Sequence, residues 1–195
     1  PLDYGEQALV DLNEIEMRWL DRWVRDIPNG IEDEPPVKIF VMGANIWREE
    51  QEWPPARAVE RRYYLAGRGR ANGASGDGFL GETAPADADT EDTCLYDPSK
   101  PVPTIGGSLL GAWAGPNDHA AIENRMDVLV YTGPEIRKPV EVTGFVKAVL
   151  YVQTDGPDTD FVARLCDVYP DGRSLIVCDG IARLQRAHGM LRIYR

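Results

Sequence analysis

Two hydrophobic patterns divide the chain into a short first part and a long second part. From Glu6 to Ile27, apolar residues recur every three or four positions, which predicts a helix with one apolar face. Pro28, Asn29 and Gly30 end this pattern, because proline cannot continue the helical hydrogen bonds and glycine or asparagine accepts a left-handed cap. The apolar positions of the predicted helix are Leu9, Leu12, Ile15, Trp19, Trp23 and Ile27.

The apolar face of this helix carries two tryptophans, Trp19 and Trp23. Two indole rings need a large partner surface, and the remaining sequence predicts few other helices that could supply one. We therefore expect the surface that covers this helix to lie outside the chain.

After Pro36 the pattern changes from a helical repeat to short β-type runs. Pro170-Asp171-Gly172 stands between two such runs and predicts a hairpin turn, since proline presets φ and glycine accepts a positive φ. Runs separated in this way by Gly, Pro and Asp are typical of an antiparallel sandwich such as a jelly roll. The predicted strands are 37–42, 61–65, 127–132, 146–154, 160–169 and 175–184.

Residues 66–103 show almost no periodicity. Between Ala71 and Ser99 the chain has seven acidic residues and no lysine or arginine, which predicts a solvated loop. The whole chain has a net charge of −11. Such a field repels phosphate backbones and anionic lipids, so we expect neither a nucleic-acid partner nor a membrane partner.

The cysteines and the hydrophobic runs bear on localisation. Cys94, Cys166 and Cys178 are too few and too scattered for a disulfide framework or a zinc knuckle, so we expect free thiols. No run reaches the roughly 18 apolar residues of a membrane span, and the first residues do not resemble a signal peptide. We expect a cytoplasmic protein.

No complete catalytic constellation stands in the sequence. A serine hydrolase presents its nucleophile in Gly-x-Ser-x-Gly on a strand-to-helix turn. The nearest match, around Ser108, has Leu110 where the second glycine belongs, so a nucleophilic role is disfavoured. The only histidines, His119 and His188, fall in stretches predicted as loops, where a surface or interface role is the default. We expect no catalytic residue in this chain.

The sequence also predicts no cofactor and no metal. The glycines of 76–81 have the spacing of a dinucleotide loop, but no strand precedes them and an acidic tract follows. Three aspartates near a predicted strand entry could gather a calcium ion, but capping of turns is the favoured role for such residues. They are Asp155, Asp158 and Asp160.

Three tryptophans lie on predicted loops, and they leave two roles open. Trp47, Trp53 and Trp113 could line a sugar or acyl pocket, or they could pack between domains. Interdomain packing is favoured, since tryptophan contributes large apolar area wherever two layers meet. Together with His119, these residues are our candidates for pocket-lining or interdomain contacts.

The order of segments resembles that of the CocE/NonD hydrolases, which include cocaine-esterase-like and X-Pro dipeptidyl-peptidase-like serine hydrolases. The string from Asp158 to Arg173, DTDFVARLCDVYPDGR, is the most specific part of this resemblance. The first half is similar to the end of the catalytic domain and the crossover from it, and the second half to the C-terminal jelly roll. The other matching segments are 12–23, 29–31, 35–43, 47–48, 53–55, 63–65, 103–107, 125–132, 142–144 and 179–181.

The resemblance implies a mainly β chain, with a galactose-binding-like jelly roll preceded by an amphipathic helix. Residues 1–36 would be the terminal helix and linker of an α/β-hydrolase domain, and residues 37–195 an incomplete C-terminal β-sandwich. The family's Ser, Asp and His lie upstream of these segments, so the chain alone is expected to be inactive. His119 also stands where relatives usually carry glutamine, and 184–195 departs from the family pattern.

Two functional hypotheses follow. In the first, the chain is the non-catalytic domain of a serine hydrolase for ester or amide bonds, and it packs on the α/β-hydrolase domain and shapes the substrate pocket. In the second, it is a free-standing carbohydrate-binding or ligand-binding module. The predicted helix favours the first, because a self-contained sugar module has no use for two tryptophans on a leading helix.

The resemblance also implies further strands that this chain lacks. We therefore expect the strand at Leu175–Cys178 to become an open edge that invites self-association. Alternatively, the tail residues Leu191–Tyr194 could fold back as a substitute strand.

Overall fold

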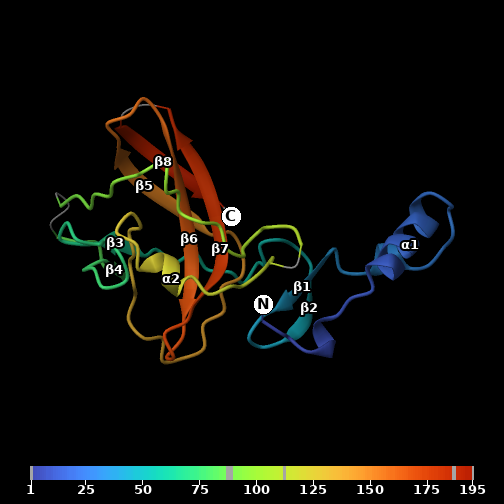
Figure 1. The fold of residues 1–195 in the computed structure, drawn as a ribbon. Helices are drawn as coiled ribbons and strands as arrows, with labels where there is room; N and C mark the ends of the chain where they lie inside the picture. The colour runs from blue at the N-terminus through green and yellow to red at the C-terminus, as the bar shows by residue number, and fades with distance from the viewer. Residues whose placement is uncertain (1, 87–89, 112, 186–187, 195) are drawn as a thin grey trace. The chain divides into compact units, whose positions relative to one another are not determined.

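The computed structural model describes residues 2–86, 90–111, 113–185 and 188–194 (Figure 1). The chain divides into two compact units, one of residues Asp3–Ala58 and the other from Val59 onward together with Leu2. The predicted domain boundary between residues 36 and 37 concerns the full-length protein and stays a prediction.

The smaller unit contains the predicted amphipathic helix. Helix α1 spans Leu12–Trp23 and begins at Asp11, whose carboxylate accepts the backbone N–H groups of Asn13 and Glu14. The helix therefore begins later than the predicted Glu6, because Asp11 caps it. Residues Glu6–Ala8 form the separate 3₁₀ turn η1. No residue of α1 is buried. Trp19 and Trp23 are 56% and 53% exposed, so the smaller unit leaves the apolar face largely uncovered, as expected.

A β-hairpin forms the rest of this unit. Strands β1 (Val37–Val41) and β2 (Ile46–Glu50) pair antiparallel, and the 3₁₀ turn η2 (Ile31–Asp33) precedes them. The Trp47 indole packs edge-on against Phe40, with ring centroids 5.3 Å apart, and its N–H donates to the Gln7 carbonyl at 2.9 Å. Trp47 thus ties the N-terminal segment to the hairpin.

The larger unit is mainly β, which confirms the predicted class. Strands β5 (Lys147–Gln153) and β8 (His188–Tyr194) pair antiparallel, as do β6 (Thr159–Val168) and β7 (Ser174–Leu184). A second short pair, β3 (Tyr64–Ala66) with β4 (Phe79–Gly81), and the short helix α2 (Ala120–Glu123) complete it. The predicted hairpin turn is confirmed, since Gly172 has φ 90° and donates its N–H to the Tyr169 carbonyl.

The core lies where β7 and β8 approach each other, and the long strands are stacked there in Figure 1. Gly180 permits this approach, because a Cβ at this position would lie 2.6 Å from Cγ2 of Ile193. Residues of β5 and β8 alternate between the core side and solvent, as a half-buried sheet requires. The buried apolar residues are Ala71, Ile122, Leu175, Ile176, Leu184, Leu191 and Ile193.

Two predictions about strand edges have different outcomes. The tail does fold back, since Leu191–Tyr194 pair with β5 as part of β8. The edge of β7 is not open at its start, because Ile176 donates its N–H to Asn117 and Ser174 accepts the N–H of His119. The expectation of an open edge there is therefore wrong for residues 174–176.

The predicted strand at 127–132 is also wrong. This segment forms only isolated bridges, Leu129 with Asn72 and Thr132 with Phe79. Its backbone bonds go mainly to the turns of residues 71–78, for example from the Val130 N–H to the Ala71 carbonyl. The β-branched and aromatic residues of this segment favour an extended backbone. Its hydrogen-bond partners lie in loops, however, so no regular ladder of strand pairs forms.

The acidic stretch is only partly the solvated loop that we expected. Strand β4 lies within it, and Asp92 accepts the Ala71 N–H at 3.1 Å and the Tyr131 hydroxyl at 2.9 Å. Gly67 lies against the same carboxylate, since a Cβ there would be 2.5 Å from an Asp92 oxygen. Buried backbone N–H groups need acceptors, and Asp92 supplies one from a distant part of the sequence.

Candidate functional site

An apolar loop projects from the larger unit between Gly107 and Gly115. These two glycines exchange backbone hydrogen bonds of 2.8 and 2.9 Å, and both have positive φ. The loop carries large apolar side chains into solvent: Leu110 is 101% exposed and Trp113 is 71% exposed. Residue 112 lies outside the described residues. Apolar groups gathered on one exposed loop are typical of a contact with another surface.

The base of this loop is anchored. Asn117 donates its side-chain amide to the carbonyls of Trp113 and Gly115 at 3.1 and 3.3 Å. Gly106 is buried beside the same segment, and a Cβ there would lie 2.6 Å from the Gly115 carbonyl oxygen. These bonds fix the two ends of the loop, and an apolar tip on such a base suits contact with a partner surface.

His119 stands next to this base. The sequence predicted a surface or interface position, and the surface alternative is wrong. It is 1% exposed and forms the N-cap position of α2. Its Nε2 lies 2.6 Å from the Ile105 carbonyl oxygen, so Nε2 carries the hydrogen and donates it. A general base must reach its substrate, and this ring is enclosed. His119 therefore has a structural role at the root of the loop.

A polar cluster continues from His119 into β6 and β7. The Ser174 hydroxyl donates to Glu123 at 2.6 Å, and Cys166 lies beside both. Burial, together with the nearby Glu123 carboxylate, raises the pKa of the Cys166 thiol to about 11. Asp118 accepts the N–H groups of Ala120 and Ser174, which hold its pKa below the usual range. These contacts join α2 to the hairpin of β6 and β7.

The other two catalytic candidates, Ser108 and His188, lie apart from His119 in the sequence and have different surroundings. The exposed Ser108 hydroxyl donates to Asp179 at 3.4 Å. His188 is exposed on β8, opposite Gln153, rather than on a loop as predicted. With His119 enclosed, none of these contacts pairs a serine with an accessible histidine base.

The three aspartates considered for calcium do not form a cluster of metal-binding side chains in the described structure. Asp160 receives both of its hydrogen bonds from Arg183, at 2.8 Å each. The pKa of Asp160 is lowered by these bonds and by the Arg183 charge. Within the described parts of the chain, no group of three or more His, Cys, Asp or Glu side chains could hold a metal ion.

The tryptophan candidates are distributed between the two compact units. Trp47 and Trp53 belong to the smaller unit, and Trp113 and His119 to the larger. Trp47 takes part in the aromatic contacts of the hairpin and is 37% exposed, and Trp53 is 42% exposed. The pocket-lining or interdomain role of these residues stays a prediction.

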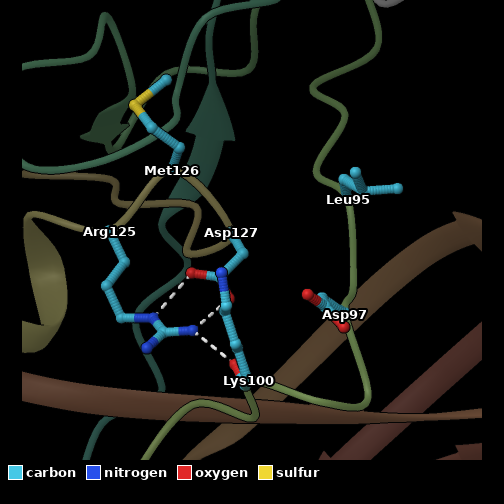
Figure 2. Close-up of a pocket in the computed structure, with 6 residues that line it drawn as sticks. All are labelled: Leu95, Asp97, Lys100, Arg125, Met126 and Asp127. Carbon is cyan, nitrogen blue, oxygen red and sulfur yellow. Dashed lines mark hydrogen bonds and ion pairs between the residues drawn. The ribbon is translucent and has the colours of Figure 1, made fainter.

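Figure 2 shows an open pocket in the larger unit, lined by a central ion pair and two exposed apolar side chains, Leu95 and Met126. Arg125 donates to both Asp127 oxygens, at 2.7 and 2.5 Å, and to the Lys100 carbonyl at 2.7 Å. This pairing raises the pKa of Arg125 and lowers that of Asp127. The Arg125 and Asp127 charges neutralise each other, and Asp97 and Lys100 also line the pocket.

Sequence reasoning did not single out Leu109 and Leu110, which the structure leaves exposed at the tip of the loop. It considered Gly106–Gly111 only as a nucleophile motif. Two adjacent leucines between glycines were the available signal, since a short apolar pair in a turn has no neighbouring core to enter.

Comparisons with known proteins agree with the resemblance. Residues 29–191 match the X-Pro dipeptidyl-peptidase C-terminal non-catalytic domain. The cocaine esterase of Rhodococcus sp. (strain MB1 Bresler) is 43% identical over 169 residues, which are 86% of this chain and 29% of that protein. A putative serine esterase of Mycobacterium bovis is 30% identical over 86% of this chain and 25% of its own length.

A solved structure shows the same fold. The crystal structure of an aminopeptidase from a marine-sediment Thaumarchaeota archaeon matches with a TM-score of 0.66 and 25% identity. The match covers 93% of this chain and 33% of that one. The chain thus spans about a quarter to a third of the length of the relatives that it matches.

No helix among the described residues is long and apolar enough to cross a membrane.

The domain match covers most of the chain, and the fold and the curated relatives agree with it. The chain belongs to the family of X-Pro dipeptidyl-peptidase C-terminal non-catalytic domains, which it shares with cocaine-esterase-like hydrolases.

Proposed function

We propose that this chain is the non-catalytic C-terminal part of a serine hydrolase for ester or amide bonds. It packs on an α/β-hydrolase domain and shapes that domain's substrate pocket. The main support for this proposal is the apolar loop 107–115, which is anchored at its base and whose Leu110 side chain is fully exposed. An exposed leucine on an anchored loop is unfavourable in water and becomes favourable when a partner surface covers it.

The uncovered helix α1 supports the same proposal. The rings of Trp19 and Trp23 contact each other in a tilted arrangement, with centroids 5.6 Å apart, and both remain more than half exposed. Two such rings can each bury about 150–250 Å² against a partner. A free-standing ligand-binding module offers no reason for this helix, so that alternative is not favoured.

The proposal has three further parts. Without a catalytic domain the chain does not hydrolyse esters or amides. The exposed face of α1, which includes Leu12, supports self-association of the isolated chain. Cytoplasmic localisation is the third part, and it rests on the sequence, whose three scattered cysteines are too few for a disulfide framework.

The experiment compares variants of the full-length hydrolase that contains this chain. Leu110→Asp should lower kcat/KM for a p-nitrophenyl ester by about tenfold or more, equivalent to about 1.4 kcal/mol. Ile136→Asp is the matched control, because Ile136 is 69% exposed outside the loop, and it should stay within about twofold of the wild type. Equal losses in both variants, or no loss in Leu110→Asp, would contradict the role of the loop.

A further inference from the structure

Glu50 is a carboxylate at the end of β2 that is almost closed off from solvent. Its exposed fraction is 9%, and it stands opposite Val37 in the hairpin. Burying a carboxylate without partners costs free energy. The groups that bind Glu50 therefore indicate its role.

Two arginines hold this carboxylate. Arg57 donates from both terminal nitrogens to the two Glu50 oxygens, at 2.6 and 2.5 Å, and Nε of Arg48 lies 2.9 Å from Oε1. The hydrogen bonds from Arg57 lower the pKa of Glu50 against the opposing effect of burial, and the two arginine charges add to this. A bidentate arginine fixes the orientation of its partner as well as its position.

The ion pair closes the segment between its two ends. Glu50 and Arg57 are seven residues apart, and Trp53, Pro54 and Pro55 lie between them. Pro55 is buried and accepts the Ala58 N–H at 2.8 Å. The rings of Pro54 and Pro55 restrict φ at the two positions after Trp53. Trp53 therefore stands 42% exposed within a segment that is tied at both ends.

We infer that Glu50 is a positioning residue, which holds the segment 51–57 so that Trp53 is ready to contact the catalytic domain. This inference rests on the proposed function, and the occupant is the α/β-hydrolase domain of the same protein. The cocaine esterase that this chain resembles is long enough to include such a domain, since this chain covers only 29% of its length. A tryptophan on a preordered segment adds contact area and loses little freedom on docking.

The first test measures the order of the segment in the 195-residue chain. Glu50→Gln removes the charge and leaves two arginines side by side, so amide hydrogen exchange in residues 51–57 should quicken by about tenfold or more. Glu49→Gln is the matched control, because Glu49 is exposed and adjacent. Exchange that stays unchanged in Glu50→Gln, or that rises equally in Glu49→Gln, would overturn the inference.

The second test asks whether Glu50 acts through Trp53. In the full-length hydrolase, Glu50→Gln and Trp53→Ala should each reduce kcat/KM for an ester by about fivefold. The double variant should have the same kcat/KM as Trp53→Ala alone. If Glu50 acts only by positioning the Trp53 side chain, its replacement has no further effect once that side chain is removed. A purely structural role would instead give losses that multiply, and that result would overturn the positioning role.

The two tests separate this inference from the proposed function. If the wild-type full-length protein hydrolyses no ester or amide, the proposed function fails, and the inferred partner fails with it. The exchange experiment still shows whether Glu50 orders the segment. If exchange responds to Glu50→Gln while hydrolysis does not respond to Trp53→Ala, then the segment is ordered but the docking role of Trp53 is overturned.

Discussion

His119 and Ile105 are joined by a hydrogen bond of 2.6 Å between the imidazole Nε2 and the carbonyl oxygen. The ring is 1% exposed, and its backbone N–H bonds to Ser174 on β7. One residue thus connects the segment that leads into loop 107–115 with the start of a core strand. The sequence predicted a surface or interface histidine, and the structure makes it a connection between two segments that are distant in the sequence.

Replacement of His119 should therefore destabilise the chain. His119→Ala removes a buried donor and leaves the Ile105 carbonyl without it, which should cost about 1–3 kcal/mol. His119→Gln keeps a donor amide and should lose less. Urea unfolding followed by tryptophan fluorescence gives the free energy of unfolding of each variant. Equal stability of His119→Ala and the wild type would contradict this role.

Asp118 should contribute stability that depends on pH. Two backbone N–H groups, from Ala120 and Ser174, hold its folded-state pKa below its ordinary value of about 3.9. The contribution is therefore complete above about pH 3.9 and is lost as the pH falls through the lower folded-state pKa. Acid titration of Asp118→Asn should show a weaker fall in stability over that interval. Asp155→Asn, at an exposed position, is the control and should follow the wild type.

Gly78 should tolerate no side chain. A Cβ at Gly78 would lie 2.0 Å from the Val130 carbonyl oxygen, which is backbone and cannot rotate away. Gly78→Ala should lower the free energy of unfolding by about 2 kcal/mol or more. At Gly156 the nearest atom would be 3.7 Å away, so Gly156→Ala should remain close to the wild type in thermal unfolding. A Gly78→Ala variant that is more stable than Gly156→Ala would contradict the close contact of Gly78 with the Val130 carbonyl.

The cysteines should differ in reactivity. Cys166 is partly buried and its thiol has a pKa raised to about 11, so little thiolate is present at neutral pH. Cys94 is exposed, although burial of its sulfur also raises its pKa. Alkylation by iodoacetamide at pH 8, read by peptide mass spectrometry, should modify Cys94 before Cys166. Faster modification of Cys166 in the folded chain would contradict the contact with Glu123 and Ser174.

The isolated chain should not hydrolyse p-nitrophenyl butyrate, because a nucleophile and its base act as a unit. Turnover that disappears in Ser108→Ala or His119→Ala would contradict this prediction. Turnover that survives both substitutions would point to a contaminating esterase.

The sequence by itself determined the features that depend on neighbours along the chain. The apolar repeat and Asp11 define α1, and Pro170-Asp171-Gly172 makes the turn between β6 and β7. Alternation along β5 likewise decides which side chains face the core. These features follow from helix and strand periods and from turn chemistry, which act over a few residues.

Only the tertiary structure decided which distant residues meet. Asp92 bonds to Tyr131 across 39 positions, and Ser174 to Glu123 across 51. The same chain path buries His119 and leaves Leu110 in solvent, although both lie in stretches that read alike as loops. Periodicity carries no information about such pairs, because a long loop can close in many ways at nearly equal entropic cost and packing selects among them.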